Sequence, residues 1–378
     1  MPTNTAAWLL AAQKPLEVKS ALYPQPREGE IVVKNHAVAI NPIDWGMQLF
    51  GTLLFPWITY PFILGGDLAG EVVEVGEGVT RFSVGDRVLA LAAGTDKTRN
   101  SSAEGAFQQY TLVLAHMAAP IPPTMSYENA CVLPLTLSTA ACGLFHKDHL
   151  ALHYPSATPQ PTGKTLLIWG GSTSVGSNAI QLAVAAGYEV ITTTSPRNFH
   201  YARKLGASQV FDYRQKDVVK DIIEAFKGKI CAGALAIGEG SATACADIVH
   251  ACNGNKCISL ASPPVSLNAL PSDLRPGLDL RLFPFLFRFV AANTTLQLKF
   301  RTKGIRAKSI SDSTSLADTD YNKVCKLIYE DFLPQALAAG SYIAAPEPVV
   351  VGQGLDHIQA GLDAQRQGVS AQKVVVSL

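Results

Sequence analysis

The stretch "WGGSTSVGSNAIQLA", residues 169–183, decides the fold of this chain. An apolar run, "TLLI", comes directly before it, and a helical pattern of small and apolar residues follows. A buried strand, a glycine-rich turn and a helix in this order form the context of a dinucleotide-binding turn. Gly170 permits the tight turn, and Gly176 lets the helix pack closely on the strand. Thr173 stands where a middle glycine is expected, so we expect the hydroxyls of Thr173 and Ser172 to contact phosphate oxygens instead.

Strand-like and helix-like segments alternate four times after this turn. Loops of a few residues join them, which predicts a parallel sheet with helices on both faces. The first third of the chain instead shows many short strands with glycine turns, which is typical of a barrel-like β unit. In the last third, a helical pattern at 321–340 precedes two strand-like segments, 346–352 and 373–378, which fit a return to the first domain. We therefore expect an α/β chain with two domains.

Composition and charge narrow the class of protein. The 378 residues are 48% hydrophobic and carry a formal net charge of +1, so we expect no nucleic-acid partner. The seven cysteines include no C-x-x-C pair, and the first residues lack a basic and apolar leader, which predicts reduced thiols in a cytoplasmic protein. The apolar segment 280–292 is too short to cross a bilayer. We expect it to pack as a core or interdomain helix; the alternative is contact with a membrane surface.

The end of the second strand of the predicted sheet indicates which nucleotide binds. NAD sites place an Asp or Glu there to hold the ribose 2′-hydroxyl. The segment "VITTTSPRN" (190–198) has no acid and offers Ser195, Arg197 and Asn198. A carboxylate would repel a 2′-phosphate, whereas Arg and Ser would bind it. The sequence therefore favours NADPH over NADH.

Five motifs carry a resemblance to a known family: "NPID" (41–44), "GGDLAGEVVEVGEGVTRFSVGDRV" (65–88), "GAFQQYTLV" (105–113), "LPLTLSTAACGL" (133–144) and the glycine-rich stretch up to 187. With them the chain resembles the medium-chain dehydrogenase/reductase superfamily over nearly its whole length. Within that superfamily it is similar to the quinone-reductase and enoyl-reductase branch. Two segments, "TSPRNFHYARKLGASQVFDYR" (194–214) and "VVVGQGLDHIQAGLDAQRQGVSAQKVVVSL" (349–378), resemble fungal trans-acting enoyl reductases. They resemble fungal cip-type proteins with a zinc-binding alcohol dehydrogenase domain more closely still.

The resemblance implies a fold with two domains. Residues 1–126 and 304–378 would form a GroES-like, β-rich catalytic domain. Residues 127–303 would form a Rossmann domain with a doubly wound parallel sheet that binds NADP.

Zinc-dependent members of this superfamily hold a catalytic metal through an early Cys, a His in a G-H-E motif and a later Cys or Glu. Here the early position falls within "NPIDWG" (41–46) and is not Cys, and we place the G-H-E position at Gly66, Asp67 and Leu68. The four cysteines of the family's structural zinc are missing from 90–110. Zinc needs three or four thiolate, imidazole or carboxylate ligands, so we expect no metal site.

The resemblance also implies roles for individual residues. The residues expected to bind the cofactor are Ile43, Asp44, Trp45, Gly170, Ser172, Thr173, Ser174, Val175, Gly176, Ser195, Arg197, Asn198, Tyr213, Val350 and Val351. Those expected to bind substrate are Gly46, Leu135, Ser138, Thr139, Leu260 and Ala261. Quinone reductases carry N-P-x-D-T-Y, whose Tyr is a proposed proton donor, and Gly46 occupies that position here. The candidate catalytic residues are Asp44, Tyr60 and Thr136, and the choice of proton donor between Tyr60, Thr136 and solvent stays open.

These features together predict an NADPH-dependent reductase. Without zinc as a Lewis acid, the activated C=C bond of an enone or enoyl thioester is a better hydride acceptor than a simple carbonyl. We expect a small unsaturated carbonyl compound of fungal secondary metabolism as substrate. The alternatives are a quinone or carbonyl reductase, an alcohol dehydrogenase on the same scaffold, or a non-catalytic NADPH-binding protein. The segment "TTLQLKF" (294–300) is expected to be a strand that pairs two chains in a homodimer, unless Lys299 blunts it and leaves a monomer.

Overall fold

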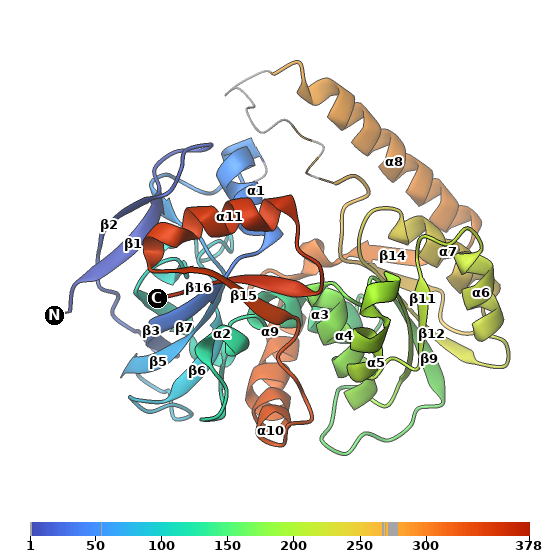
Figure 1. The fold of residues 1–378 in the computed structure, drawn as a ribbon, viewed down its shortest axis with the longest axis horizontal. Coiled ribbons are helices and arrows are strands. Elements are labelled where there is room, and N and C mark those ends of the chain that lie inside the picture. Colours follow the sequence, from blue (N-terminus) through green and yellow to red (C-terminus); the bar gives the residue numbers. More distant parts are fainter. Residues whose placement is uncertain (1, 54, 267, 269, 271–278) are drawn as a thin grey trace. The chain divides into compact units, whose positions relative to one another are not determined.

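A computed structural model describes residues 2–53, 55–266, 268, 270 and 279–378 of the chain (Figure 1). The chain divides into two compact units. The first contains the residues up to Leu135 and those from Cys325 onwards, and the second contains the described residues between them. Residues 127–135 therefore lie with the first unit and 304–324 with the second, whereas the sequence placed the boundaries at 126 and 304.

The first unit is built mainly from strands. They are β1 (Asn4–Leu9), β2 (Glu17–Ala21), β3 (Glu30–Ala39), β4 (Phe62–Ile63), β5 (Asp67–Val75), β6 (Arg87–Leu91), β7 (Tyr110–Leu114), β8 (Ala118–Pro120), β15 (Glu347–Gln353) and β16 (Gln372–Ser377). The larger sheet has the order β15-β16-β3-β5-β6-β8, with β7 also paired to β3, and a smaller sheet has the order β2-β1-β4. The central strand β3 pairs antiparallel with β5, β7 and β16, so the C-terminal strand joins strands from the first 114 residues in one sheet.

The helices of the first unit are α1 (Pro42–Phe50), α2 (Tyr127–Ala130), α10 (Leu333–Ala338) and α11 (Ile358–Gln367), and α9 (Thr319–Lys326) ends in it. The single helix expected at 321–340 is instead divided into α9, a π-helical segment Leu327–Phe332 and α10. Pro334 stands at the start of α10 and has no N–H for an α-helical hydrogen bond, which accounts for the change of winding before it.

The second unit is a six-stranded parallel sheet with helices on both faces (Figure 1). Its strands are β9 (Lys164–Trp169), β10 (Glu189–Thr194), β11 (Gln209–Asp212), β12 (Ile230–Ala236), β13 (Cys257–Leu260) and β14 (Arg306–Ser309). Its helices are α3 (Pro134–Phe145), α4 (Ser174–Ala185), α5 (Phe199–Lys204), α6 (Val218–Ala225), α7 (Ser241–Ala251) and α8 (Leu282–Thr302). The strand order β11-β10-β9-β12-β13-β14 confirms the predicted doubly wound sheet. Its direction of winding reverses between β9 and β12, at the strand that precedes the glycine-rich turn.

Helix α8 differs from two expectations. The strand predicted at 294–300 is wrong, because these residues form the C-terminal half of α8. Their alternation imitates a strand, but Leu296 and Phe300, four residues apart on the helix, pack into the core beneath the sheet. The N-terminal half of α8 does not pack as core: Phe283 is 54% and Phe287 is 76% exposed.

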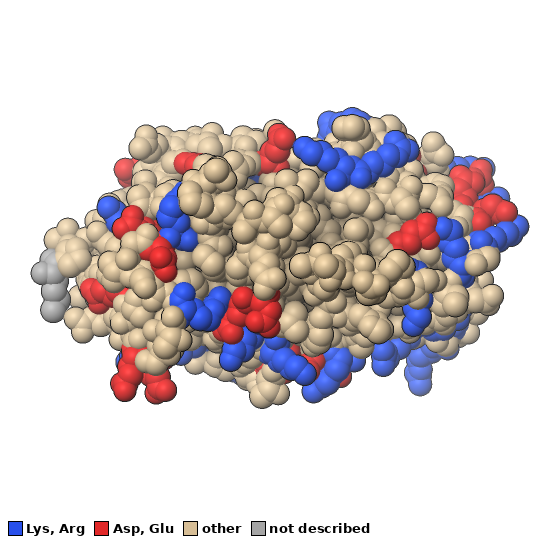
Figure 2. Space-filling view, turned by 90° about the horizontal axis from the view of Figure 1, so that it is seen from below, with Lys and Arg blue, Asp and Glu red and all other residues tan. Residues whose placement is uncertain are grey.

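The distribution of charge, the state of the cysteines and the apolarity of the helices relate to the expectations drawn from composition. On the face seen in Figure 2, acidic and basic side chains are interspersed among uncharged ones. All seven cysteines are buried and unbonded to one another. Among the helices that the structure describes, none combines the length and apolarity that crossing a bilayer requires.

Candidate functional site

The glycine-rich turn after β9 has the geometry that the sequence predicts. Gly170 adopts a φ of +94°, which side chains disfavour. A Cβ on Gly176 would lie 2.2 Å from the carbonyl oxygen of Gly170 and 2.8 Å from the Cα of Gly171. Only glycine fits there, because both neighbours are backbone atoms. The turn thus brings the start of α4 directly against the end of β9.

Thr173 uses its hydroxyl differently from our expectation. The Oγ1 atom donates to the carbonyl oxygen of Gly170 at 2.8 Å and accepts from the N–H of Gly176 at 3.0 Å. Its proton is therefore directed into the turn rather than towards a phosphate, and Thr173 acts as the N-cap of α4. Ser174 and Val175 follow as the first two helical residues, whose N–H groups have no partner within a helix. These two N–H groups and the dipole of the twelve-residue helix are suited to a pyrophosphate.

The end of β10 offers the groups expected near a 2′-phosphate. Arg197 is exposed, and the Nδ2 atom of Asn198 donates to the Oγ atom of Ser195 at 3.3 Å. Tyr213, at the end of the neighbouring strand β11, is 47% exposed. The parallel pairing of β10 and β11 places these ends on one edge of the sheet.

An acid that we did not predict from the sequence also lies at this edge. Asp212 pairs in register with Thr194, but its Oδ1 atom accepts from the N–H and the Nε of Arg214, at 3.1 and 3.2 Å. The carboxylate is thus partly neutralised by its own neighbour.

The predicted substrate residues of the second unit lie on α3 and after β13. Thr136 and Ser138 are 5% and 2% exposed, and the Oγ1 atom of Thr136 accepts from the Nδ2 of Asn178 on α4 at 3.1 Å. Thr139 is partly exposed, and so are Leu260 and Ala261 at the carboxyl end of the sheet. Thr136 thus faces α4, whereas Leu135 and Thr139, four residues apart on the otherwise buried α3, are partly exposed.

In the first unit, the predicted residues of α1 divide between surface and interior. Ile43 is 39% exposed. Trp45 is 5% exposed, and its Nε1 donates to the Oε1 of Gln365 on α11 at 2.5 Å. The indole therefore fastens α1 to α11. Val350, on β15, is 49% exposed.

Gly46 and Tyr60 lie near α1, and neither is fully packed or hydrogen-bonded as buried groups usually are. Gly46 is buried, yet a Cβ built on it would meet no atom within 4 Å other than its chain neighbours and the backbone of its own helix. The hydroxyl of Tyr60 is buried and has no hydrogen-bond partner in the described part of the chain. It points at Gly51, just beyond the last residue of α1, and burial raises its pKa. The helix thus has free space beside its middle and an unpaired hydroxyl at its end.

The first unit also contains a buried cluster of polar side chains that we did not predict from the sequence. The Nζ atom of Lys373 lies 3.0 Å from Oδ2 of Asp67 and donates to Oδ1 of Asn41. The Nδ2 atom of Asn41 donates to the same carboxylate at 2.8 Å. Asp44 is also buried, and burial raises its pKa to about 7, with the nearby Asp67 adding to the shift. The "NPID" motif and Asp67 signalled part of this cluster, but nothing near Lys373 did.

Comparison with known proteins adds to this geometry. Residues 27–123 match the alcohol dehydrogenase GroES-like domain, and residues 174–254 match the zinc-binding dehydrogenase family. The dehydrogenase pigH of Monascus ruber is 53% identical to this chain over 380 residues, which cover all of both proteins. The chain belongs to the medium-chain dehydrogenase/reductase superfamily. It is therefore an oxidoreductase with a GroES-like and a Rossmann unit, and it binds a nicotinamide cofactor.

Two further members of the medium-chain dehydrogenase/reductase superfamily are informative. The trans-enoyl reductase himH of Aspergillus japonicus is 37% identical, over 99% of this chain and 97% of its own. A crystal structure of an alcohol dehydrogenase superfamily protein from Novosphingobium aromaticivorans covers both chains fully, with 25% identity and a TM-score of 0.72. The chain thus resembles enoyl reductases of the superfamily as well as dehydrogenases.

Zinc is the metal that the name of one matching family implies, and the residues of this chain do not fit it. In the described ranges, no group of three or more His, Cys, Asp or Glu side chains is placed to hold a metal ion. Asp67, at the position we compared with the family's ligand motif, is already bound by Lys373 and Asn41.

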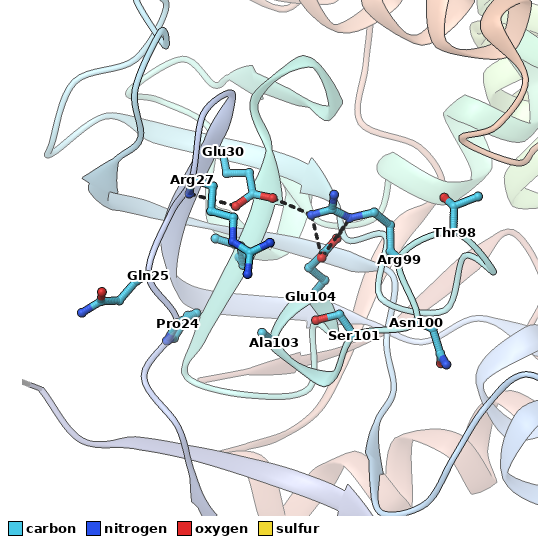
Figure 3. A pocket seen from close by; sticks show the side chains of 11 residues that line it. Pro24, Gln25, Arg27, Glu30, Thr98, Arg99, Asn100, Ser101, Ala103 and Glu104 are labelled. Carbon is cyan, nitrogen blue, oxygen red and sulfur yellow. Dashed lines mark hydrogen bonds and ion pairs between the residues drawn. The ribbon is translucent and has the colours of Figure 1, made fainter.

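The segment in which the superfamily carries its structural zinc is fastened by charge instead (Figure 3). The Nε atom of Arg99 lies 3.0 and 2.9 Å from the two carboxylate oxygens of Glu104. The Nη2 atom of the same guanidinium lies 2.5 Å from Oε1 of Glu30, the first residue of β3. Both glutamates are almost fully buried. Beside this triad lies a polar hollow of about 520 Å³, to which Arg27 also contributes.

Proposed function

We propose that this oxidoreductase uses NADPH to reduce the activated C=C bond of an α,β-unsaturated carbonyl compound, an enone or an enoyl thioester. The observation that supports it most is the open space beside Gly46, at the position where quinone reductases carry a tyrosine. The 37% identical relative named as a trans-enoyl reductase supports the same reaction. The engagement of Asp67 by Lys373 speaks against a metal-bound carbonyl at this position.

In the proposed reaction, residues of the chain would bind the cofactor and supply a proton. When bound, NADPH supplies the hydride, which adds to the β-carbon while the electron pair of the C=C bond moves towards the carbonyl oxygen. The N–H groups of Ser174 and Val175 would hold the pyrophosphate, and Arg197 and Ser195 the 2′-phosphate. A proton then completes the reduction at the α-carbon. Solvent and Tyr60 are the sources we favour, because the Tyr60 hydroxyl has no hydrogen-bond partner among the described residues, whereas Thr136 faces α4.

A panel of acceptors tests the reaction type. We expect the absorbance of NADPH at its reduced-nicotinamide band to fall with an enone, and to stay constant with an ortho-quinone or an aldehyde. Turnover of the aldehyde alone would replace the proposal with a carbonyl reductase. No turnover of any acceptor, with NADPH bound, would make the chain a non-catalytic binding protein.

Replacing Arg197 with alanine tests the choice of cofactor. We expect Arg197→Ala to weaken NADPH binding about tenfold or more while changing NADH binding little, because one charge-assisted contact contributes roughly 1.5–3 kcal/mol. Calorimetric titration of both cofactors measures the difference. The exposed Lys227, on the same unit and already paired with Glu224, is the control: Lys227→Ala should change neither affinity. Equal affinity of the unaltered protein for both cofactors would contradict the assignment.

Filling the space beside Gly46 tests the location of the substrate. We expect Gly46→Trp to lower kcat/KM for bulky enones tenfold or more and to leave NADPH affinity unchanged. The control is Gly46→Ala, whose Cβ has room and should stabilise the helix by about 0.5–1 kcal/mol. If Gly46→Trp reduces bulky enones as fast as the unaltered protein does, the substrate lies elsewhere.

A further inference from the structure

The cluster around Lys373 joins four segments of the first unit that lie far apart in the sequence. Lys373 is on β16, Asp67 is the first residue of β5, and Asn41 directly precedes α1. The fourth partner is Leu135, whose backbone N–H donates to the Oδ1 atom of Asp67 at 2.6 Å. Each side-chain oxygen and nitrogen atom of this cluster therefore has a partner in a different segment.

The cluster is charged and shielded from water. Asp67 is fully buried, and Lys373 is 4% exposed. Charges at such depth persist only when they are paired and hydrogen-bonded, because the interior screens them poorly. Asp67 meets this condition with Lys373 and Asn41 on one oxygen and Leu135 on the other. Taking away the ammonium group would leave a buried carboxylate without a cation.

Two segments depend on this cluster for their position. Asn41 is the residue before α1, and its N–H donates to Oδ2 of Asp44 at 2.7 Å, which closes the first turn of the helix. With both ends of its side chain held by Lys373 and Asp67, Asn41 fixes where Ile43 and Asp44 stand. Asp67 likewise fixes the backbone at the start of α3 through its bond to Leu135. These are the segments to which we assign the nicotinamide and the substrate.

We propose that Lys373 is a positioning residue of the reductase site, which it serves by holding Asp67 and Asn41 and, through them, the first turn of α1 and the N–H of Leu135. The expected effect of Lys373 on turnover rests on the proposed function. Its expected effect on the positions of the first turn of α1 and of Leu135 does not. Lys373 itself touches neither cofactor nor substrate in this proposal.

Three variants separate positioning from plain stabilisation. Lys373→Met removes the cation, and Lys373→Arg keeps the charge but changes the donor geometry. Asp67→Asn combined with Lys373→Met removes both charges, so that no uncompensated carboxylate remains. Lys34→Met, at an exposed position of β3 in the same unit, is the matched control. Each variant is measured for melting temperature, for kcat and KM with an enone, and for hydrogen–deuterium exchange of peptides covering 41–50, 133–140 and 164–194.

We expect Lys373→Met to lower kcat about tenfold or more and to speed exchange in 41–50 and 133–140, but not in 164–194. The double variant should regain most of the melting temperature and still show low kcat and fast exchange. Asn41 has lost its bond to Lys373, and the amide at position 67 keeps one acceptor oxygen for the two donors, Asn41 and Leu135. Recovery of kcat and of slow exchange together with the melting temperature would overturn the proposal and leave Lys373 a purely stabilising residue.

The same variants and measurements also cover two other possible results. If Lys373→Met does not fold, Lys373→Arg carries the test: a lower kcat with a near-normal melting temperature supports positioning, and unchanged kcat and exchange refute it. If the unaltered protein reduces no enone, the proposed function fails, whereas the exchange of 41–50 and 133–140 still decides whether Lys373 holds these segments.

Discussion

Replacing Gly176 with valine is expected to weaken NADPH binding about a hundredfold while the protein stays folded. The new Cβ would lie 2.2 Å from a backbone oxygen, so the turn must open and the first N–H groups of α4 must move away from the pyrophosphate. Overpacking of this kind costs about 1–3 kcal/mol, which NADPH binding would have to supply to restore the turn. A hundredfold loss of affinity corresponds to about 2.7 kcal/mol, within that range. Calorimetric titration with NADPH measures the loss.

The control for Gly176→Val places a valine at the other end of the same helix. Ala185→Val, at the last residue of α4, should leave NADPH affinity within about twofold of the unaltered value, since it is remote from the turn. Unchanged NADPH affinity in Gly176→Val, with a normal melting temperature, would mean that the pyrophosphate does not lie on this turn.

The second large effect is a dependence of stability on pH that originates at Asp44. Burial raises the pKa of this carboxyl to about 7, whereas an unfolded Asp titrates near 3.9. Between about pH 4 and 7 the folded chain therefore keeps a proton that the unfolded chain has released. The contribution of Asp44 to the free energy of unfolding is complete below about pH 4 and is lost as the pH rises to 7. The loss amounts to about 4 kcal/mol at 1.36 kcal/mol per pKa unit.

Comparison with Asp44→Asn isolates this contribution, because asparagine imitates the protonated carboxyl. His149 gives an opposite slope in the same range, since burial lowers its pKa to about 4, and the comparison removes it. Urea denaturation at pH 4.5, 5.5, 6.5 and 7.5 should show the stability difference between the two proteins growing in favour of Asp44→Asn with rising pH. Parallel curves would show that Asp44 releases its proton in the folded state as easily as in the unfolded one.

Local signals in the sequence were enough to predict the nucleotide-binding half of the fold. Around the turn at Gly170–Gly176, a buried strand, a site of close packing and a helix start all fall within fifteen residues. All the sequence features that a dinucleotide-binding turn requires are therefore neighbours in the chain. The parallel sheet with helices on both faces followed because strands that alternate with helices have few alternative arrangements. Short-range alternation misled us at 294–300, where packing of Phe300 against the sheet favours a helix over a strand.

Side chains of the candidate site were harder to predict where their hydrogen-bond partners are distant in the sequence. Thr173 is a common N-cap residue, and its hydroxyl is taken by the turn itself, a competition that residue type alone does not reveal. Lys373 reads as an ordinary first residue of a terminal strand, and only the fold brings it beside Asp67 and Asn41. Trp45 has an aromatic surface suited to a cofactor, yet its position against Gln365 depends on where α11 lies.

The pairing of β3 with the much later strand β16 sets an order of events during biosynthesis. Strand β3 pairs with β16 between residues 37–39 and 375–377, so part of its edge has no partner until the final strand is made. At about 5–20 residues per second, a ribosome needs roughly 15–60 s to add the stretch between Asp67 and Lys373. During that interval Asp67 has no cation, and the second unit is synthesised entirely. The first unit can therefore complete its sheet only after the second unit has been synthesised, although its residues up to Leu135 emerge first.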